Sequence, residues 1–346
     1  MKQKKITRTQ LVSGLLLLFI GNCSFNNSEN ANQNTVTVTD IATGLEIPWA
    51  IDFLPDGSMI FTQRPGEVKL QRDNTTELIG QIDVIHQGEA GLLGVAVDPD
   101  FNENNYIYLY YTYQQQAMFN RISRFTLNGS LSDEFIVLDS IDGANIHNGG
   151  RIKFGPDGLL YATTGDANDP SLSADTNSLA GKILRMEKDG SVPGDNPFGN
   201  YVYALGLRNP QGLAWRDDTL YASSHGPVRR DELHRIERGM DYGWPEPCDQ
   251  TGLAFRCYTE FTLAPSGIAI YENMLLVTGL RGNQLRRVDL QSDQEFEHLT
   301  ELGRLREVVL YEGYLYIATS NRDGRGTPQP NDDRIVKVDP NALIHN

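Results

Sequence analysis

The sequence predicts an all-β protein, a six-bladed β-propeller with four-stranded antiparallel blades. A recurring unit of two short strands joined by a tight turn, then a variable loop and a third strand, occurs six times. Apolar and polar residues alternate within the units, and almost no segment has the 3.6-residue period of an amphipathic helix. Units of roughly 40–60 residues match propeller blades, whereas a β-sandwich would have fewer and less regular hairpins.

The six units follow one another along most of the chain. They cover residues 48–70, 91–113, 149–166, 210–227, 265–290 and 306–324. In the third unit the alternating stretches 152–154 and 160–162 flank a Pro-Asp-Gly turn, which is typical of a hairpin. A third strand that often carries arginine or lysine follows each pair.

A stretch that precedes the first unit, TVTVTD at residues 35–40, also has strand character. We expect it to supply the missing strand of the last blade and so to close the ring. The innermost strands of a propeller line a central channel. Functional residues are therefore expected where units begin and where their second strands end.

The first 35 residues are expected to lie outside the propeller. The first ten carry four cations and the next ten are almost wholly apolar, which is typical of a secretory signal peptide and too short for a membrane-spanning helix. The next residues, Ile-Gly-Asn-Cys, resemble a bacterial lipobox, with plain cleavage as the alternative. We expect a signal peptide at 1–22, a flexible tether with a lipid anchor at Cys23 over 23–35, and the propeller domain at 36–346.

This pattern predicts an exported protein, either periplasmic or anchored to the outer membrane of a bacterium through Cys23. The formal net charge is −15, and loss of residues 1–22 with their four cations takes it to −19. So acidic a chain is a poor partner for nucleic acid, and none is expected.

The two other cysteines, Cys248 and Cys257, are separated by eight residues. In an oxidising compartment this spacing predicts a loop disulfide, with two free thiols as the alternative. A zinc site is not expected, because no histidine or third cysteine lies nearby in the sequence.

Cationic and polar side chains gather at the predicted channel mouth. They lie before units or after second strands, and they are His147, Arg208, Asn209, Arg281, Arg304 and Arg306. Four arginines at one mouth repel one another unless an anion lies among them; pairing of each with a surface carboxylate is the alternative. Arginine binds carboxylates and phosphates, and a glycine-rich phosphate loop is missing from the sequence. A small cofactor or substrate with several carboxylates is therefore expected.

A second unusual stretch, SSHGP at 223–227, contains Gly226 and Pro227. Such a loop exposes backbone carbonyls that cannot all join a strand ladder, and Ca²⁺ accepts oxygens of this kind. Beside an anion pocket, we expect a calcium ion to bridge these carbonyl oxygens to the carboxylates of the ligand. A simple turn is the alternative.

Several stretches together resemble one known family. GEAGLLGVAVDPDF, IHNGGRIKFGPDG, GLRNPQGLAW, HGP with DEL downstream, YGWP and GRLRE occur in the order seen in the soluble quinoprotein glucose and aldose sugar dehydrogenases. These enzymes use pyrroloquinoline quinone (PQQ), and the resemblance covers roughly residues 40–340. It implies a six-bladed propeller with PQQ over the channel and calcium at the cofactor. It also implies oxidation of aldose sugars at the anomeric carbon to lactones.

The resemblance implies roles for individual residues. His147 is similar to the general base that takes the proton of the anomeric hydroxyl, a role that suits imidazole. Arg208 resembles the residue whose positive charge stabilises the reduced quinone. The positions similar to cofactor-holding residues or calcium ligands are Arg208, Asn209, Arg281, Arg304, Arg306, Gly226 and Pro227. Gly149 and Gly150 are expected to allow a sharp bend after His147 and close approach of a flat ligand.

The sequence departs from the family pattern at two positions. Ile146 stands where the glucose enzyme has an acidic residue, and Glu89 stands where that enzyme has what resembles a glutamine. Loops that shape its sugar pocket are also missing, so an open site and a broad range of aldoses are expected. Asp231 and Glu232 are interpreted as exposed acidic loop residues, with a second calcium site as the alternative.

Two other functions remain as alternatives. A calcium-dependent propeller lactonase or other hydrolase would hold its metal with carboxylate and amide side chains in the channel, whereas arginine and histidine stand at these unit starts. A non-catalytic propeller that binds glycans or proteins would need neither a buried histidine nor convergent arginines. The favoured hypothesis is an oxidoreductase with an aldose substrate, PQQ and Ca²⁺, and an unidentified electron acceptor.

Overall fold

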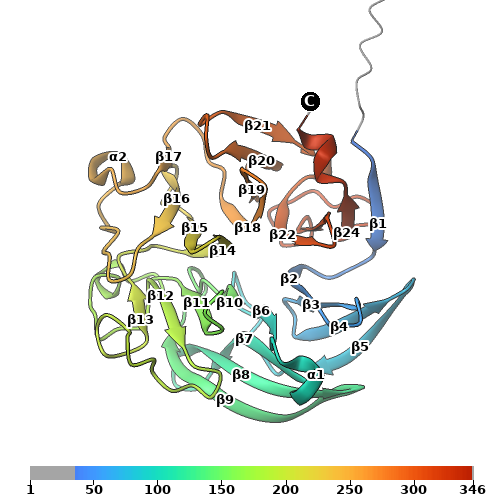
Figure 1. Cartoon of the computed structure of the whole chain (residues 1–346), viewed down its shortest axis with the longest axis horizontal. Coiled ribbons are helices and arrows are strands. Elements are labelled where there is room, and N and C mark those ends of the chain that lie inside the picture. Colours follow the sequence, from blue (N-terminus) through green and yellow to red (C-terminus); the bar gives the residue numbers. More distant parts are fainter. Residues whose placement is uncertain (1–35, 345–346) are drawn as a thin grey trace, which may run out of the picture. The chain divides into compact units, whose positions relative to one another are not determined.

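The computed structural model describes residues 36–344, which form a ring of six blades (Figure 1). Each blade is one four-stranded antiparallel sheet, so the predicted fold class is confirmed. The predicted signal peptide (1–22) and the tether with Cys23 (23–35) lie outside the described residues. Within residues 36–344, none of the helices is long and apolar enough to cross a membrane.

The first three blades follow chain order from the innermost strand outward. The first contains β2 (Pro48–Phe53), β3 (Met59–Gln63), β4 (Glu67–Arg72) and β5 (Thr75–Gln81). The second contains β6 (Leu92–Val97), β7 (Tyr106–Gln114), β8 (Met118–Asn128) and β9 (Ser130–Asp142). The third contains β10 (Ile152–Phe154), β11 (Leu160–Thr164), β12 (Lys182–Met186) and β13 (Val202–Ala204).

The next two blades repeat this order, and short helices lie in the loops. The fourth blade contains β14 (Pro210–Arg216), β15 (Thr219–Ser224), β16 (Asp231–Ile236) and β17 (Arg256–Tyr258). The fifth contains β18 (Pro265–Tyr271), β19 (Met274–Gly279), β20 (Gln284–Asp289) and β21 (Glu295–His298). The helices are α1 (Phe101–Asn104), α2 (Cys248–Thr251) and the 3₁₀ turns Pro170–Leu172, Thr300–Leu302 and Pro340–Leu343.

The sixth blade joins the two ends of the described chain. It contains β22 (Leu305–Tyr311), β23 (Tyr314–Thr319) and β24 (Ile335–Val338), and β1 (Val38–Ala42) is its outermost strand. Val38 lies opposite Val338, and Asp40 lies opposite Val336. The prediction that the stretch before the first unit closes the ring is therefore confirmed.

The third unit shows how the sequence produces a hairpin. Gly158 adopts φ +76°, and its amide donates to the Gly155 carbonyl to close the turn. Ile152 then pairs with Ala162 across β10 and β11. All of β11 is buried despite its alternating sequence, because both faces of a blade pack against other blades. One hydrophobic cluster accordingly runs through the first three blades.

The arrangement of the inner strands fixes where a site can form. Strands β2, β6, β10, β14, β18 and β22 surround the centre, and β22 contacts β2 again. Because the first two strands of each blade are antiparallel, the loop before the first and the loop after the second lie at the same mouth of the channel. Residues near 147, 208, 226, 281 and 304 are thereby brought to one end of the ring.

Candidate functional site

A cavity of about 330 Å³ opens at this mouth. Six of the eight predicted site residues line it: His147, Arg208, Gly226, Pro227, Arg281 and Arg304. The other two, Asn209 and Arg306, are 0% and 4% exposed and do not line it. The positions before units and after second strands therefore meet at one cavity.

His147 is held at both its backbone and its ring. It adopts φ +61°, and its amide donates to Glu89 Oε2 at 3.1 Å. Its Nδ1 lies 2.7 Å from Asp166 Oδ1, while Trp244 Nε1 donates to Asp166 Oδ2 at 2.8 Å. Within residues 36–344, Nε2 has no hydrogen-bond partner. A histidine oriented by a carboxylate at one ring nitrogen, with its other ring nitrogen unoccupied, can act as a general base.

Sequence reasoning missed Asp166. It follows the second strand of its unit, β11, where functional residues are expected, but the sequence pattern at such positions indicated cationic side chains. The close approach of residues 147 and 166 depends on how two loops of the third blade pack. A Cβ on Gly165 would collide with the His147 carbonyl, which shows how closely these loops meet.

The glycines after His147 have a different purpose from the one expected. Gly149 and Gly150 adopt φ +62° and +103°, so the sharp bend is confirmed. A Cβ on Gly149 would meet the backbone of Thr163, and one on Gly150 would meet the side chain of Leu93. The space beside both glycines is filled by protein, so the expected approach of a flat ligand at these positions is wrong.

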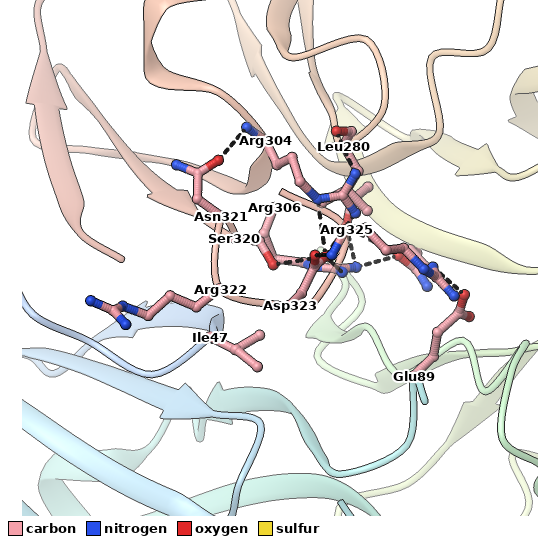
Figure 2. A network of polar contacts seen from close by, with 12 residues as sticks. Ile47, Glu89, Leu280, Arg304, Arg306, Ser320, Asn321, Arg322, Asp323 and Arg325 are labelled. Carbon is pink, nitrogen blue, oxygen red and sulfur yellow. Dashed lines mark hydrogen bonds and ion pairs between the residues drawn. The ribbon is translucent and has the colours of Figure 1, made fainter. Parts of the chain in front are cut away.

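Asp323 supplies a carboxylate to the arginine cluster (Figure 2). Arg304 donates to Asp323 Oδ2 from Nε at 3.1 Å and from Nη2 at 2.7 Å, and its Nη1 donates to the Leu280 carbonyl. Arg306 Nη2 lies 3.9 Å from the same oxygen. Burial raises the pKa of Asp323, but Arg304 holds it below its ordinary value. For Arg304 the alternative of pairing with a carboxylate of the chain therefore holds, although the Asp323 carboxylate is buried rather than on the surface.

The other members of the cluster are only partly satisfied by protein acceptors. Arg208 makes one long hydrogen bond, 3.3 Å, to the His225 carbonyl. Asn209 Nδ2 and Arg306 Nε are buried and unpartnered. The Arg281 side chain is exposed, with no ion pair in the described part of the chain. Unpaired guanidinium and amide groups are costly to bury, so this set fits an anionic ligand with several carboxylates.

Glu89 and Arg325 form a bridge across the mouth. Arg325 Nη1 donates to Glu89 Oε1 at 2.9 Å, from a loop of the sixth blade to the loop before the second (Figure 2). Burial raises the pKa of Glu89, but the charge interaction with His225, followed by the hydrogen bonds from Arg325 and the His147 amide, lowers it to about 2. The sequence noted Glu89 as a departure but did not indicate its partner, which is 236 residues away.

The loop with Gly226 and Pro227 is braced by Asp231. Asp231 is 1% exposed, and its carboxylate accepts the amides of Gly226, Leu263 and Ala264 at 2.7 to 2.9 Å. Glu232 Oε2 lies 3.1 Å from His234 Nε2. The interpretation of Asp231 and Glu232 as exposed loop residues is therefore wrong, since both belong to β16.

The carbonyl oxygens of Gly226 and Pro227 accept no hydrogen bond from residues 36–344, and both residues line the cavity. Uncommitted carbonyl oxygens suit a hard cation such as Ca²⁺. A cluster of three or more His, Cys, Asp or Glu side chains that could hold a metal is not found in the described part of the chain. The two carbonyl oxygens are therefore the protein ligands that this loop offers to a cation.

His225 is a second imidazole in the cavity wall. Burial, followed by the positive charges of Arg306 and Arg208, lowers the pKa of His225 to about 3. The ring is therefore neutral near pH 7, and its Nε2 is buried without a partner. The stretch SSHGP pointed to this loop, but the sequence argument used only its glycine and proline.

Comparisons with known proteins show which family this chain resembles. A family model described as Glucose / Sorbosone dehydrogenase matches residues 45–327. The PQQ-bound aldose sugar dehydrogenase of Streptomyces coelicolor is 37% identical, with a TM-score of 0.81 over 88% of this chain and 98% of that chain. A Thermus thermophilus oxidoreductase described as glucose dehydrogenase is 38% identical, with a TM-score of 0.82 over 88% and 99%. The Escherichia coli aldose sugar dehydrogenase YliI is 29% identical over 84% of this chain and 91% of its own length.

Proposed function

The chain belongs to the glucose/sorbosone dehydrogenase family and is a sugar-oxidising oxidoreductase, and we propose that it converts aldoses to lactones with PQQ and Ca²⁺ bound in the cavity at the channel mouth. The observation that carries this proposal is His147, held by Asp166 at 2.7 Å, beside guanidinium and amide donors that lack protein acceptors. The cavity thus offers a base and an anion site side by side.

The residues at the cavity fit PQQ, which carries several carboxylates. Arg208 and Arg281 line the cavity and have free donors for them. Asn209 and Arg306 do not line it, but each keeps one buried nitrogen without an acceptor in the described part of the chain. Arg304 contributes its positive charge, although Asp323 already accepts two of its hydrogen bonds. Gly226 and Pro227 would hold Ca²⁺ through their carbonyl oxygens. When bound, PQQ supplies the two-electron oxidant that accepts hydride from the anomeric carbon.

His147 takes the other hydrogen of the reaction as a proton. Asp166 accepts a hydrogen bond from Nδ1, which leaves Nε2 as the basic nitrogen. Nε2 takes the proton of the anomeric hydroxyl as the carbon loses hydride, and the C–O bond becomes the lactone carbonyl. Arg208 supplies positive charge where negative charge develops, and stacking over Trp244 at 5.5 Å steadies its guanidinium.

The proposed substrates are aldoses of several kinds. Ile146, next to His147, lines the cavity and offers no hydrogen bond to a sugar hydroxyl from its side chain. Fewer fixed polar contacts give weaker discrimination between sugars that differ in one hydroxyl. We therefore expect broad aldose specificity rather than strict selection of glucose.

Reconstitution tests the proposed function. Purified protein is incubated with PQQ and Ca²⁺ and assayed with several aldoses and an artificial electron-accepting dye. We expect dye reduction with more than one aldose and the absorption spectrum of the bound cofactor. Protein that neither binds PQQ nor reduces the dye with any sugar would refute the proposal.

Two variants separate the base from the cofactor site. His147→Ala should keep cofactor binding and lose turnover, whereas Arg306→Ala should weaken PQQ binding first. Cofactor affinity is measured by titration and turnover at saturating PQQ. Sugar oxidation by His147→Ala at the normal rate would show that another group is the base.

We also propose that the protein is exported, with the signal peptide at 1–22, the tether at 23–35 and the propeller domain from residue 36. Mass spectrometry of the mature protein after expression in a bacterium tests this proposal. An N-terminal, lipidated Cys23 would support the membrane tether, and an unmodified N-terminus after residue 22 would support plain cleavage.

A further inference from the structure

The rim of the cavity is cationic, although the chain has a formal net charge of −15. Arg281 and Arg325 line the cavity and are exposed, and Arg229 is exposed beside it. Arg229 and Arg281 have no ion-pair partner within residues 36–344. The acidic side chains that line the cavity, Glu89 and Asp231, are not exposed and already accept hydrogen bonds.

An exposed apolar residue stands among these charges. Val228 lines the cavity, and 73% of its surface is exposed. Thr262 Oγ1 donates to the Val228 carbonyl, so the loop that presents this side chain is held in place. Arginine is enriched in protein–protein interfaces, and an exposed valine beside it adds apolar contact area.

The inference rests on the proposed function, which requires an electron acceptor. Each aldose oxidised to a lactone releases two electrons and two protons, and the electrons must leave before the next turnover. A cavity of about 330 Å³ that holds PQQ and a sugar has little room for another molecule inside. The electrons are therefore transferred across the rim.

From the charge and the exposed apolar residue, we propose that Val228, Arg229 and Arg325 form a docking surface for a one-electron redox protein with an acidic face. Two oxidised carriers each take one electron per sugar, and the two protons pass to solvent. Opposite charges on the two surfaces steer the encounter, so the rate of carrier reduction falls as salt screens them.

The first test compares electron carriers of opposite charge with the reconstituted holoenzyme. Plastocyanin, which is acidic, and mitochondrial cytochrome c, which is basic, are supplied in turn, and their reduction is followed at increasing ionic strength. The rate should fall with salt for plastocyanin and rise or stay flat for cytochrome c. The direction of the salt effect is compared, because the two carriers differ in driving force.

Arg229→Glu tests the rim itself, and Arg216→Glu is the matched control. Arg216 ends β14 and thus lies at the other end of the strand that Arg208 and Asn209 precede. At low salt we expect Arg229→Glu to slow plastocyanin reduction roughly 10-fold, with little change in Arg216→Glu. Surface plasmon resonance should show weaker plastocyanin binding to the Arg229→Glu holoenzyme, independently of turnover.

Reduction of the bound cofactor by sugar alone separates this inference from the proposed function. Stopped-flow absorbance without any acceptor should be the same in the wild type and in Arg229→Glu. Failure of this step in the wild type would refute the proposed function. If the cofactor is reduced normally but the rate of plastocyanin reduction changes neither with salt nor in Arg229→Glu, the proposed docking surface is overturned. An effect of Arg229→Glu on ferricyanide but not on plastocyanin would also overturn it, in favour of a small anionic acceptor.

Discussion

His147 adopts a backbone conformation that few residues other than glycine adopt. At φ +61° its Cβ is crowded, and neighbouring contacts must maintain this geometry. Glu89 holds the amide and Asp166 holds the ring, from two different loops. The residue proposed as the base is therefore fixed before a ligand binds, which lowers the cost of aligning it with a sugar.

Asp166→Asn should lower kcat strongly while the fold is retained. Asparagine can donate to Nδ1 and so favour the tautomer in which Nε2 carries the proton and cannot act as a base. We expect a loss of roughly 10²–10⁴-fold in kcat, with sugar KM changed only a few-fold. Steady-state kinetics of the reconstituted enzyme measures this split.

Trp244→Phe is the control for Asp166→Asn. It removes the 2.8 Å hydrogen bond to Asp166 Oδ2 but leaves the bond from His147 to Oδ1. A loss in kcat well below that of Asp166→Asn is expected. Equal losses in both variants would mean that general disturbance of the loop, not the tautomer, controls turnover.

Glu89→Gln should destabilise the protein in a pH-dependent way. The pKa of Glu89 is lowered from 4.5 to about 2, so its charge stabilises the fold above pH 4.5. This contribution is lost as the pH falls from about 4.5 to about 2. We expect Glu89→Gln to cost about 1–3 kcal/mol of unfolding free energy near pH 7.

Urea denaturation at several pH values checks the Glu89 prediction. The difference between the wild type and Glu89→Gln should shrink below pH 4.5 and be small near pH 2. A constant difference over this range would show that the Glu89 carboxylate charge does not stabilise the folded state.

At the scale of elements, the β15–β16 loop carries both proposed features of the mouth, the calcium ligands and Val228. Asp231 fastens its base, and Arg230 fastens its end to Tyr258 of β17 through a 2.7 Å backbone hydrogen bond. Arg230 also pairs with Asp249 of α2. A disulfide between Cys248 and Cys257, with Cα atoms 5.8 Å apart, joins α2 to β17, in agreement with the sequence prediction.

Replacement of both Cys248 and Cys257 by serine should lower stability. A closed loop of about ten residues accounts for about 2–3 kcal/mol in the chain-entropy description. Thermal unfolding in non-reducing buffer should show a lower Tm for the double variant. Addition of a reductant should then lower the Tm of the wild type but not that of the variant. An unchanged Tm in the double variant would contradict a stabilising disulfide.

At the scale of the whole molecule, the third and sixth blades are joined by a buried ion pair between Arg151 and Glu307. Both side chains are almost fully buried, and Arg151 also stacks over Trp49 at 4.4 Å. Arg151 Nε donates to the Gln211 carbonyl, while Arg306 donates to the Gln211 side chain at 2.7 Å. These contacts join the third, fourth and sixth blades through buried polar side chains.

Glu307→Gln should destabilise the ring more than removal of the whole pair. A single replacement leaves Arg151 buried without its counterion, at a cost of about 3–5 kcal/mol, whereas apolar replacement of both partners is often nearly neutral. We therefore expect Arg151→Met with Glu307→Leu to be more stable than Glu307→Gln. Urea denaturation of the wild type and the two variants tests this order, and a double variant less stable than Glu307→Gln would contradict it.

The sequence by itself determined the architecture, because local patterns specify it. Turns and alternating strands recur six times, and each hairpin forms from residues close in the chain. The sixth unit supplies only three strands, so the stretch at 35–40 was expected to provide the fourth. The same repeat rule located His147, Arg208 and Arg281, since equivalent positions of a repeat share one end of the ring.

Only the tertiary structure decided which of these groups have partners. Asp166, Asp323 and the bridge from Arg325 to Glu89 depend on loops whose conformations follow from packing with distant segments, not from any local pattern. The sequence revealed where positive charges gather but not which of them a carboxylate of the chain already neutralises. Arg304 is neutralised by Asp323, whereas Asn209 Nδ2 and Arg306 Nε are buried without an acceptor in the described part of the chain. Because an unpaired buried donor is costly, these two groups favour a ligand that supplies an acceptor.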